Sequence, residues 1–339
     1  MKKGIDRDSH ITLAHGNGGR RMRELISDIF VRHLGNSALD TRCDAATLPF
    51  PHDQLIFTTD GFTVEPLEFP GGDIGSLAVH GTVNDLAISG ATPHYLSLNA
   101  FIEEGLAIAQ LERIVISMAA AAKACDVQIV TGDTKVVRRG EGSGLYLATS
   151  GIGTKTTTQT LAMSQIEAGD AIIISGPIGD HGTAVMLARE QFGLQGNLQS
   201  DATSVLPITA ALLAFDGLRF MRDPTRGGLA TVLHEIHRET NLGIHLKQDQ
   251  IPVRDEVASV CEILGYDPLY LACEGRVVAV IKNSQSEAAL NTLRKLPDGC
   301  DAAIIGTVNN TLPYVMLETP LGGQRIIEEL EDDPLPRIC

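Results

Sequence analysis

A polar stretch near the middle of the chain, KTTTQTLAMSQIEAGD at residues 155–170, separates two halves that each mix strand-like and helix-like segments. With 339 residues the chain is also longer than a single core usually serves. The pattern predicts an α+β protein built from two α/β domains and a flexible C-terminal tail. We place the domains at residues 1–155 and 165–321, with residues 1–40 as a leading glycine-rich loop and helix, and the tail at residues 322–339.

The first half has both kinds of periodicity. In the helix expected from the segment 111–125, Leu111, Ile114, Val115 and Met118 fall on one face and should point inward. The helices expected are residues 22–33, 73–91 and 111–125, and the strands are residues 54–61, 92–102, 127–137 and 144–154.

The second half repeats this mixture of elements without any repeat of sequence. The helices expected there are residues 181–192, 205–215, 229–240, 253–264 and 286–296. The strands expected are residues 171–179, 243–248, 276–281, 302–308 and 314–319.

Composition excludes several classes of protein. The net charge of −15 argues against nucleic acid as a general partner, because phosphate backbones are bound by basic patches. No apolar run follows the N-terminal lysines, and no 18-residue apolar window occurs, so we expect neither a signal peptide nor a membrane span. The six cysteines form no CxxC pair and fit a reducing compartment, so we expect a cytoplasmic protein. They are Cys43, Cys125, Cys261, Cys273, Cys300 and Cys339.

Four aspartates follow strands or lie in loops beside small or polar residues. A lone Asp-Gly pair usually marks a turn, and that explanation is open for each of them. Together they favour a second one, since Mg²⁺ takes one or two carboxylates and completes its shell with phosphate oxygens and water. The four are Asp60 in TTDG, Asp85 in TVNDLA, Asp133 in TGDTK and Asp223 in RDPTRGG.

Two glycine-rich stretches precede expected helices. The first is AHGNGGRRM, with Gly16, Asn17, Gly18 and Gly19, and the second is DPTRGGL, with Thr225, Arg226, Gly227 and Gly228. Backbone N–H groups at a helix start bind phosphate well. Neither stretch matches a Rossmann or P-loop fingerprint, so an ordinary loop that leads into a helix remains the alternative.

Other polar residues have both a structural and a functional interpretation. Lys135 is either a surface charge or a phosphate partner, and its neighbour Asp133 favours the phosphate. Glu274 is either part of a capped turn or a general base in a cleft. His80 and His94 flank Asp85, and a packing role is the commoner explanation for each.

The chain ends EELEDDPLPRIC, with Cys339 as its last residue. Fourteen extended residues reach roughly 46–50 Å. Pro334 and Pro336 favour an extended, polyproline-like arm. Such an arm would carry the Cys339 thiol between separate sites.

These motifs, in this order, resemble the superfamily of aminoimidazole-ribonucleotide synthetase and selenophosphate synthetase. The residues that carry the resemblance are HGNGG, TTDGFTVEP, HGTVNDLAISGA, TGDTKVV and DPTRGGLAT. The final PRIC narrows it to the carbamoyl dehydratases of hydrogenase maturation. Selenophosphate synthetase needs a reactive cysteine near the first glycine-rich loop, whereas Cys43 comes well after it. Thiamine-monophosphate kinase, another member, has no use for a terminal cysteine.

The resemblance implies an ATP- and Mg²⁺-dependent enzyme that dehydrates an S-carboxamide on Cys339 to a thiocyanate. It implies the carbamoyltransferase HypF as donor, the HypC–HypD complex as cyanide acceptor, and a homodimer formed through the N-terminal domains. In this scheme Cys339, Glu274, Lys135 and His80 are catalytic, with Glu274 as base. The four aspartates hold Mg²⁺, and nucleotide phosphates contact Asn84, Lys135 and the two glycine-rich stretches. A non-catalytic carrier and a small-molecule kinase of the same fold remain as rival hypotheses.

Overall fold

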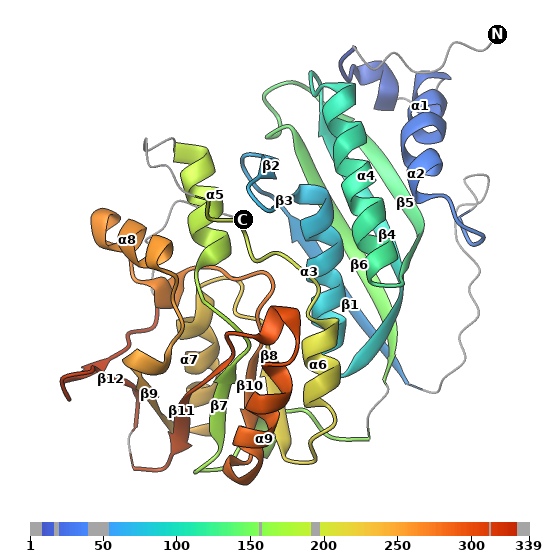
Figure 1. Ribbon diagram of the computed structural model, residues 1–339. Coiled ribbons are helices and arrows are strands. Elements are labelled where there is room, and N and C mark those ends of the chain that lie inside the picture. Colours follow the sequence, from blue (N-terminus) through green and yellow to red (C-terminus); the bar gives the residue numbers. More distant parts are fainter. Residues whose placement is uncertain are drawn as a thin grey trace. The chain divides into compact units, whose positions relative to one another are not determined.

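The computed structural model describes residues 9–16, 20–39, 54–155, 158–190, 197–311 and 313–330. The chain divides into two compact units. The first comprises the described residues up to Leu86 together with Ala91–Lys155. The second comprises Ala87–Gly90 and the described residues from 158 onward. Each unit combines helices with a mainly antiparallel sheet, which confirms the predicted α+β class (Figure 1).

The first unit is built on a four-stranded sheet in the order β1-β6-β4-β5. Its strands are β1 (Leu55–Phe62), β4 (Ala91–Glu103), β5 (Gln128–Val137) and β6 (Leu145–Lys155). Strands β4 and β5 are parallel and are joined by a helix, while β6 is antiparallel to both β1 and β4. A two-stranded ribbon of β2 (Glu68–Phe69) and β3 (Gly72–Asp73) completes the strands described there.

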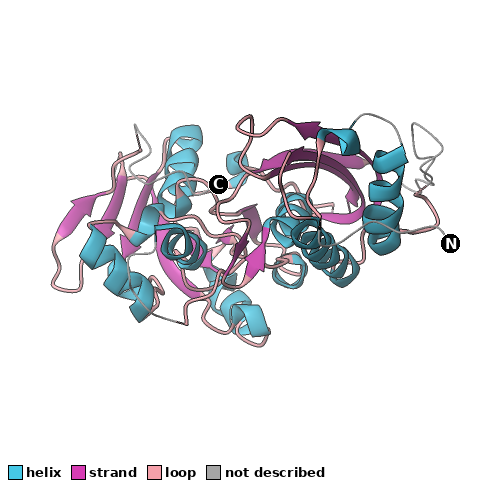
Figure 2. Cartoon of the chain, turned by 90° about the horizontal axis from the view of Figure 1, so that it is seen from above, coloured by secondary structure: helices cyan, strands magenta, loops and turns pink. Residues whose placement is uncertain are grey.

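Helices α3 (Ile74–Ile88) and α4 (Ile108–Ala124) lie against one face of this sheet (Figure 2). All four apolar residues predicted to point inward from α4 are buried, as the periodicity requires. A further helical segment runs through α1 (Arg20–Leu25), a π-helical stretch (Ile26–Val31) and α2 (Arg32–Leu34), and follows a 3₁₀ turn at Leu13–Gly16.

The opposite face of the first sheet carries exposed apolar side chains. Side chains alternate between the faces of a strand, so Leu55 and Phe57 of β1 point away from the helices. Phe101 of β4 lies on the same side, and Phe57 is 61% exposed. We call this the open face of the first unit.

The second unit contains a seven-stranded sheet in the order β13-β12-β9-β11-β7-β10-β8. Neighbouring strands are antiparallel except β12 and β9. The strands are β7 (Ala171–Ile174), β8 (Leu218–Arg222), β9 (Gly243–Lys247), β10 (Val278–Ile281), β11 (Ala303–Asn309), β12 (Val315–Glu318) and β13 (Gln324–Ile326).

Helices pack on both faces of the second sheet. One face, with Ile172 and Ile174, shares a core with α7 (Gly228–Thr240). The other, with Ile173, shares a core with α6 (Leu206–Leu212) and α9 (Asn283–Leu293). Helices α5 (Asp180–Glu190) and α8 (Asp255–Leu264) pack in a third cluster around Leu271. Short 3₁₀ turns occur at Met163–Gln165, Gln248–Gln250, Pro268–Tyr270 and Pro297–Gly299.

Two strands of the second unit are among the elements that depart from the prediction. Strand β7 ends at Ile174 instead of residue 179, because the chain turns through Gly176, Pro177 and the positive-φ Gly179. The sequence also gave no signal for β8, which is only five residues long. None of the described helices has both the length and the apolar character that a membrane crossing needs.

The second sheet continues beyond Leu321, where the sequence predicts the compact part to end. Strand β13 pairs with β12, and the N–H of Ile327 donates to the Val315 carbonyl at 2.9 Å. The Ile327 side chain is fully buried in the same core as α7. Several predicted site residues, Asn17, Gly18, Gly19 and Cys339, lie outside the described residues, as does Cys43.

Ile327 should therefore anchor the end of the second unit. We expect Ile327→Ala to lower the free energy of unfolding by about 2–5 kcal/mol, the usual cost of emptying a buried isoleucine site. The neighbouring Ile326 is 55% exposed, so Ile326→Ala is a matched control that should cost less than about 0.5 kcal/mol. Urea denaturation of both variants measures the difference, and equal losses would contradict the anchoring role.

Candidate functional site

Asp60 and Asp85 both point into the space between β1 and α3. The Thr58 hydroxyl of β1 donates a hydrogen bond of 2.8 Å to Asp85 Oδ2 on α3. Asp60 lies on the same side of β1, and its Oδ2 is 4.0 Å from the position that a Cβ on Gly81 would take, one helical turn before Asp85. The fold thus brings these two predicted ligands together from residues 25 positions apart in the sequence.

Helix α3 also carries Asn84 and His80. Asn84 is 1% exposed and His80 is half-buried, one turn apart on the helix. The hydroxyls of Thr82 and Thr149 form a short hydrogen bond that ties α3 to β6. The buried Asn84 side chain and the Thr82–Thr149 hydrogen bond hold α3 in place against the sheet. The position of α3 in turn sets the direction of the Asp85 side chain.

Asp133 and Lys135 lie on β5 and point toward the open face. Asp133 pairs in register with Asn99 of β4, and Lys135 with Phe101, whose side chain is exposed on that face. The Lys135 ammonium is 3.0 Å from Asp133 Oδ2, and its hydrogen bond holds the pKa of the Asp133 carboxyl below its usual value. Lys135 and Asp133 therefore pair with each other on a face that points away from Asp60, and the phosphate contact of Lys135 stays a prediction.

Gly16, the last described residue before the gap at residues 17–19, lies directly against β5. A Cβ on Gly16 would be 2.7 Å from the Val136 Cβ and 2.9 Å from its backbone nitrogen. Close packing against the strand of Asp133 and Lys135 explains a glycine here whether or not phosphate binds. Beside it, His15 is buried, and burial lowers the pKa of its ring.

In the second unit, the DPTRGG stretch forms a tight loop between β8 and α7. Gly227 and Gly228 both have positive φ, at 71° and 60°. A Cβ on Gly228 would stand 2.5 Å from the Leu271 carbonyl oxygen, so no larger residue fits. The Gly228 N–H donates to the Thr225 carbonyl, closing a turn that leads Thr225 and Arg226 to the start of α7.

Glu274 lies in an irregular segment before β10, which begins only at Val278. It is 9% exposed. The backbone N–H of the preceding residue, Cys273, donates to the Pro224 carbonyl at 3.0 Å. Glu274 is therefore tied through the backbone to the loop that holds Asp223 and Thr225.

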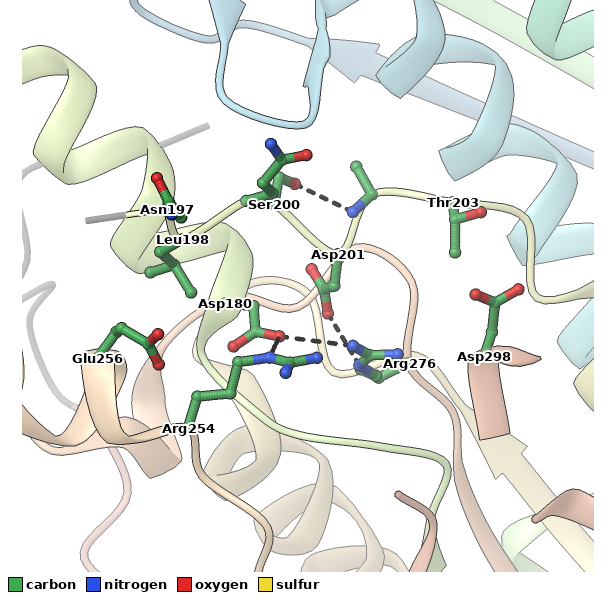
Figure 3. A pocket seen from close by; sticks show the side chains of 12 residues that line it. Asp180, Asn197, Leu198, Ser200, Asp201, Thr203, Arg254, Glu256, Arg276 and Asp298 are labelled. Atoms are coloured by element: carbon green, nitrogen blue, oxygen red, sulfur yellow. Dashed lines mark hydrogen bonds and ion pairs between the residues drawn. The ribbon is translucent and has the colours of Figure 1, made fainter. Parts of the chain in front are cut away.

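A group of charged residues, three of them buried, adjoins this segment and belongs to no motif recognised in the sequence. Arg276 Nε is 3.3 Å from Asp201 Oδ2, and its Nη2 is 3.5 Å from Asp180 Oδ2, which Arg254 Nε also contacts at 2.8 Å. Figure 3 shows the contacts of Arg276 with both carboxylates. Burial raises the pKa of the Asp201 carboxyl, against the opposing effect of Arg276. We call these four residues the Arg276 network.

The network forms one wall of a polar pocket of about 400 Å³. Asn197, Ser200, Thr203 and Asp298 contribute to the remaining walls (Figure 3). Sequence patterns did not single out Asp180, between Gly179 and His181, or Asp201, between Ser200 and Ala202, since neither belongs to a recognisable motif. Arg276 directly precedes the apolar residues of an expected strand. That position was the one indication in the sequence that its side chain is buried.

The donor set favours a metal ion that arrives with phosphate over one held by protein alone. Among the described residues, no three His, Cys, Asp or Glu side chains converge as a metal site. Asp60 and Asp85 supply a pair of carboxylates, which is the number that Mg²⁺ commonly takes beside nucleotide phosphates. The residues present fit such an ion.

Comparisons with known proteins define the class. Residues 42–154 match the N-terminal domain of AIR synthase related proteins, and residues 167–315 match their C-terminal domain. The two units are therefore those of an AIR synthase related protein, as the resemblance in the sequence predicts.

Closer relatives define the family. The chain is 45% identical to carbamoyl dehydratase HypE of Azotobacter vinelandii over 335 residues, 98% of each chain. It matches the crystal structure of hydrogenase maturation protein HypE in complex with ATP with a TM-score of 0.92 and 44% identity, covering 96% of this chain and 99% of that one. The chain belongs to the HypE family of carbamoyl dehydratases, which confirms the prediction of an enzyme of this kind.

Two further solved structures are informative. The HypE in a HypE–HypF complex matches with a TM-score of 0.80 and 42% identity, covering 90% of this chain and 99% of that one. Thiamine-monophosphate kinase from Stenotrophomonas maltophilia matches with a TM-score of 0.65 at 23% identity, covering 87% of this chain and 95% of that one, and so shares the fold alone.

A buried histidine beside the polar pocket makes stability depend on pH. His181 Nδ1 lies 2.8 Å from Ser200 Oγ, and burial lowers the pKa of His181 to about 4. The unfolded chain takes up this proton near pH 6.5, so the free energy of unfolding should fall by about 3 kcal/mol as pH drops from about 6.5 to about 4. Urea denaturation across this range should show the loss, and His181→Gln should remove it.

His10 is an exposed histidine and provides the control. His10→Gln should keep the pH dependence of the unmodified protein. A His181→Gln variant with an unchanged pH slope would show that His181 is not the group responsible.

Proposed function

We propose that this protein uses ATP to dehydrate a carbamoyl group on its own Cys339, and so supplies cyanide ligands for the iron of NiFe hydrogenase. The observation that carries this is the full-length similarity to carbamoyl dehydratase HypE, together with the PRIC ending. We expect the reaction to take place in the cytoplasm.

The chemistry requires a leaving group for the carboxamide oxygen. The S-carboxamide, –S–C(=O)–NH₂, becomes the thiocyanate, –S–C≡N, when the carbon–oxygen bond breaks and the nitrogen loses two protons. Attack of the carboxamide oxygen on the γ-phosphate of ATP releases ADP and makes that oxygen part of a good leaving group. Departure of inorganic phosphate then leaves the nitrile, so the net change is loss of one water at the expense of one ATP.

Four carboxylates would hold Mg²⁺ on the nucleotide: Asp60, Asp85, Asp133 and Asp223. Bound Mg²⁺ neutralises charge on the transferring phosphoryl group. The pairing of Asp60 with Asp85 between β1 and α3 supports this assignment. ATP itself is the nucleotide bound by the similar HypE structure.

The remaining residues would bind phosphate or move protons. Lys135 steadies the γ-phosphate, while Asn84 and the Thr225–Gly228 turn contact phosphate or metal-bound water. Glu274 accepts a nitrogen proton, because the nitrile forms only when both have left. Its burial supports this role, since a largely buried base is shielded from competing water. His80 is the second candidate for proton transfer.

Two partners follow from this scheme. The carbamoyl donor is HypF, which the structure of a similar HypE–HypF complex supports. The cyanide acceptor is the HypC–HypD complex, to which the thiocyanate on Cys339 is presented. We assign no role to nucleic acid or membranes, consistent with the net charge of −15.

We further propose that the protein is a homodimer whose copies pack through the open face of the first unit. Leu55, Phe57 and Phe101 give this face an apolar surface that a second copy would bury. Asp133 and Lys135 lie on the same face, so the partner copy would also border these two predicted site residues.

Cys339→Ala should abolish thiocyanate formation and leave ATP binding intact, because the variant lacks only the sulfur that carries the substrate. Mass spectrometry of the C-terminal peptide, after incubation with carbamoyl donor, HypF and ATP, measures this. In the unmodified protein Cys339 should first gain a carbamoyl group and then lose one water, with one ATP consumed per thiocyanate.

Cys300, an exposed cysteine of the second unit, is the matched control, and Cys300→Ala should react normally. Carbamoylation that persists in Cys339→Ala would refute the proposal. A carbamoylated protein that consumes no ATP and loses no water would favour a carrier without catalysis.

Phe57→Asp should convert the dimer to monomers, because it places a charge in the proposed apolar interface. Size-exclusion chromatography with light scattering gives the mass. Ile263 of α8 is comparably exposed in the second unit, and Ile263→Asp should remain dimeric. A Phe57→Asp variant that stays dimeric would contradict the assignment of this face.

A further inference from the structure

The Glu274 segment contacts a single carboxylate twice, through one hydrogen bond and one ion pair. The Glu274 N–H donates to Asp201 Oδ1 at 3.1 Å, and the Arg276 side chain contacts Asp201 Oδ2 at 3.3 Å. Asp201 thus contacts both neighbours of Gly275, Glu274 and Arg276. A Cβ on Gly275 would be 1.9 Å from the Asp201 carbonyl oxygen, so the two backbones run in direct contact.

Arg276 also contacts a further segment of the second unit, the turn that enters α5. Besides Asp201, its guanidinium donates to the Pro177 carbonyl at 2.9 Å and contacts Asp180 at the start of α5. The Asp201 side chain has no exposed surface, and that of Arg276 is 8% exposed. A planar fork that contacts Pro177 and Asp180 on one segment and Asp201 on another has little freedom to move.

This arrangement is more costly than stability alone requires. Removing two carboxylates and a guanidinium from water carries a large penalty, and apolar side chains of similar volume often stabilise a core equally well. The network does supply something that apolar packing does not, namely directional contacts to the backbone of an irregular segment. That segment carries the one carboxylate to which we assign proton transfer.

We propose that Asp201 and Arg276 are positioning residues that hold Glu274 in place for proton abstraction. The inference rests on the proposed function, in which Glu274 is the base. A base must lie within about 2.6–3.2 Å of the proton that it takes, so a small displacement of its backbone removes most of its effect. Asp201 and Arg276 act on the reaction only through that backbone.

Asp201→Asn tests the proposal. Protein carbamoylated on Cys339 is mixed with ATP and Mg²⁺, and conversion to thiocyanate is followed in a single turnover by mass spectrometry. We expect the rate constant to fall about 10- to 100-fold. The ATP concentration for half-maximal rate and the extent of carbamoylation should not change, since neither depends on Glu274.

A double-mutant cycle separates positioning from a general structural role. Glu274→Gln should also slow dehydration, and Asp201→Asn combined with Glu274→Gln should be no slower than Glu274→Gln alone. If the two losses multiply, Asp201 acts independently of Glu274 and the positioning proposal is wrong. If Glu274→Gln keeps the full rate, the assignment of the base in the proposed function is wrong instead.

Asp170 offers a matched control in the same unit. It is likewise buried, accepts a backbone N–H from Glu167 at 2.8 Å and contacts Arg219 at 3.4 Å, so Asp170→Asn removes an equivalent charge elsewhere. Its dehydration rate should match that of the unmodified protein. Should Asp201→Asn fail to fold, Arg276→Lys provides the same test, because lysine keeps the charge but cannot reach three acceptors. An unchanged rate in a folded variant of either residue would overturn the proposal.

Discussion

The contact between Asp201 and Arg276 ties together three segments of the second unit that are far apart in the sequence. It joins the segment before β10 to the segment before α6, and through Asp180 and Pro177 to the turn that enters α5. A charge left without its partner in such a place costs several kcal/mol, so the three segments must fold together or not at all. The geometry of Glu274 is a consequence of this requirement.

Glycine permits the close approaches on which the same region depends. Gly275 runs against the backbone of residue 201, and Gly228 runs against the carbonyl of Leu271. The turn of Asp223–Gly228 therefore packs against the backbone of residues 269–273, which leads directly into the Glu274 segment. Gly228 must also adopt a positive φ, which explains why the stretch reads RGG and why a side chain there is excluded.

Much of the fold could be predicted from the hydrophobic periodicity of the sequence, whereas the candidate site could be predicted only in part. The inward face of α4 was readable because 3.6-residue spacing reports a helix packed on a sheet. Strand β8 was not, because five residues of mixed polarity carry too little periodicity. The motif residues were identified by their resemblance to a family. Asp180 and Asp201 have no local signal, since their importance comes from burial beside Arg276, and burial depends on contacts between residues distant in the sequence.

The sheet of the first unit also limits how its predicted metal ligands can act together. Strands β1 and β5 are the two edges of the sheet, three steps apart. Neighbouring strands are about 4.8 Å apart, so Asp60 on β1 and Asp133 on β5 are separated by about 14 Å. They also point to opposite faces, Asp60 toward α3 and Asp133 toward the open face with Lys135. Because Mg²⁺ binds oxygen at about 2.1 Å, one ion cannot join these two carboxylates within one copy of the chain. The three predicted metal ligands of the first unit, which look equivalent in the sequence, therefore form two groups in space, with Asp60 and Asp85 on one face of the sheet and Asp133 on the other.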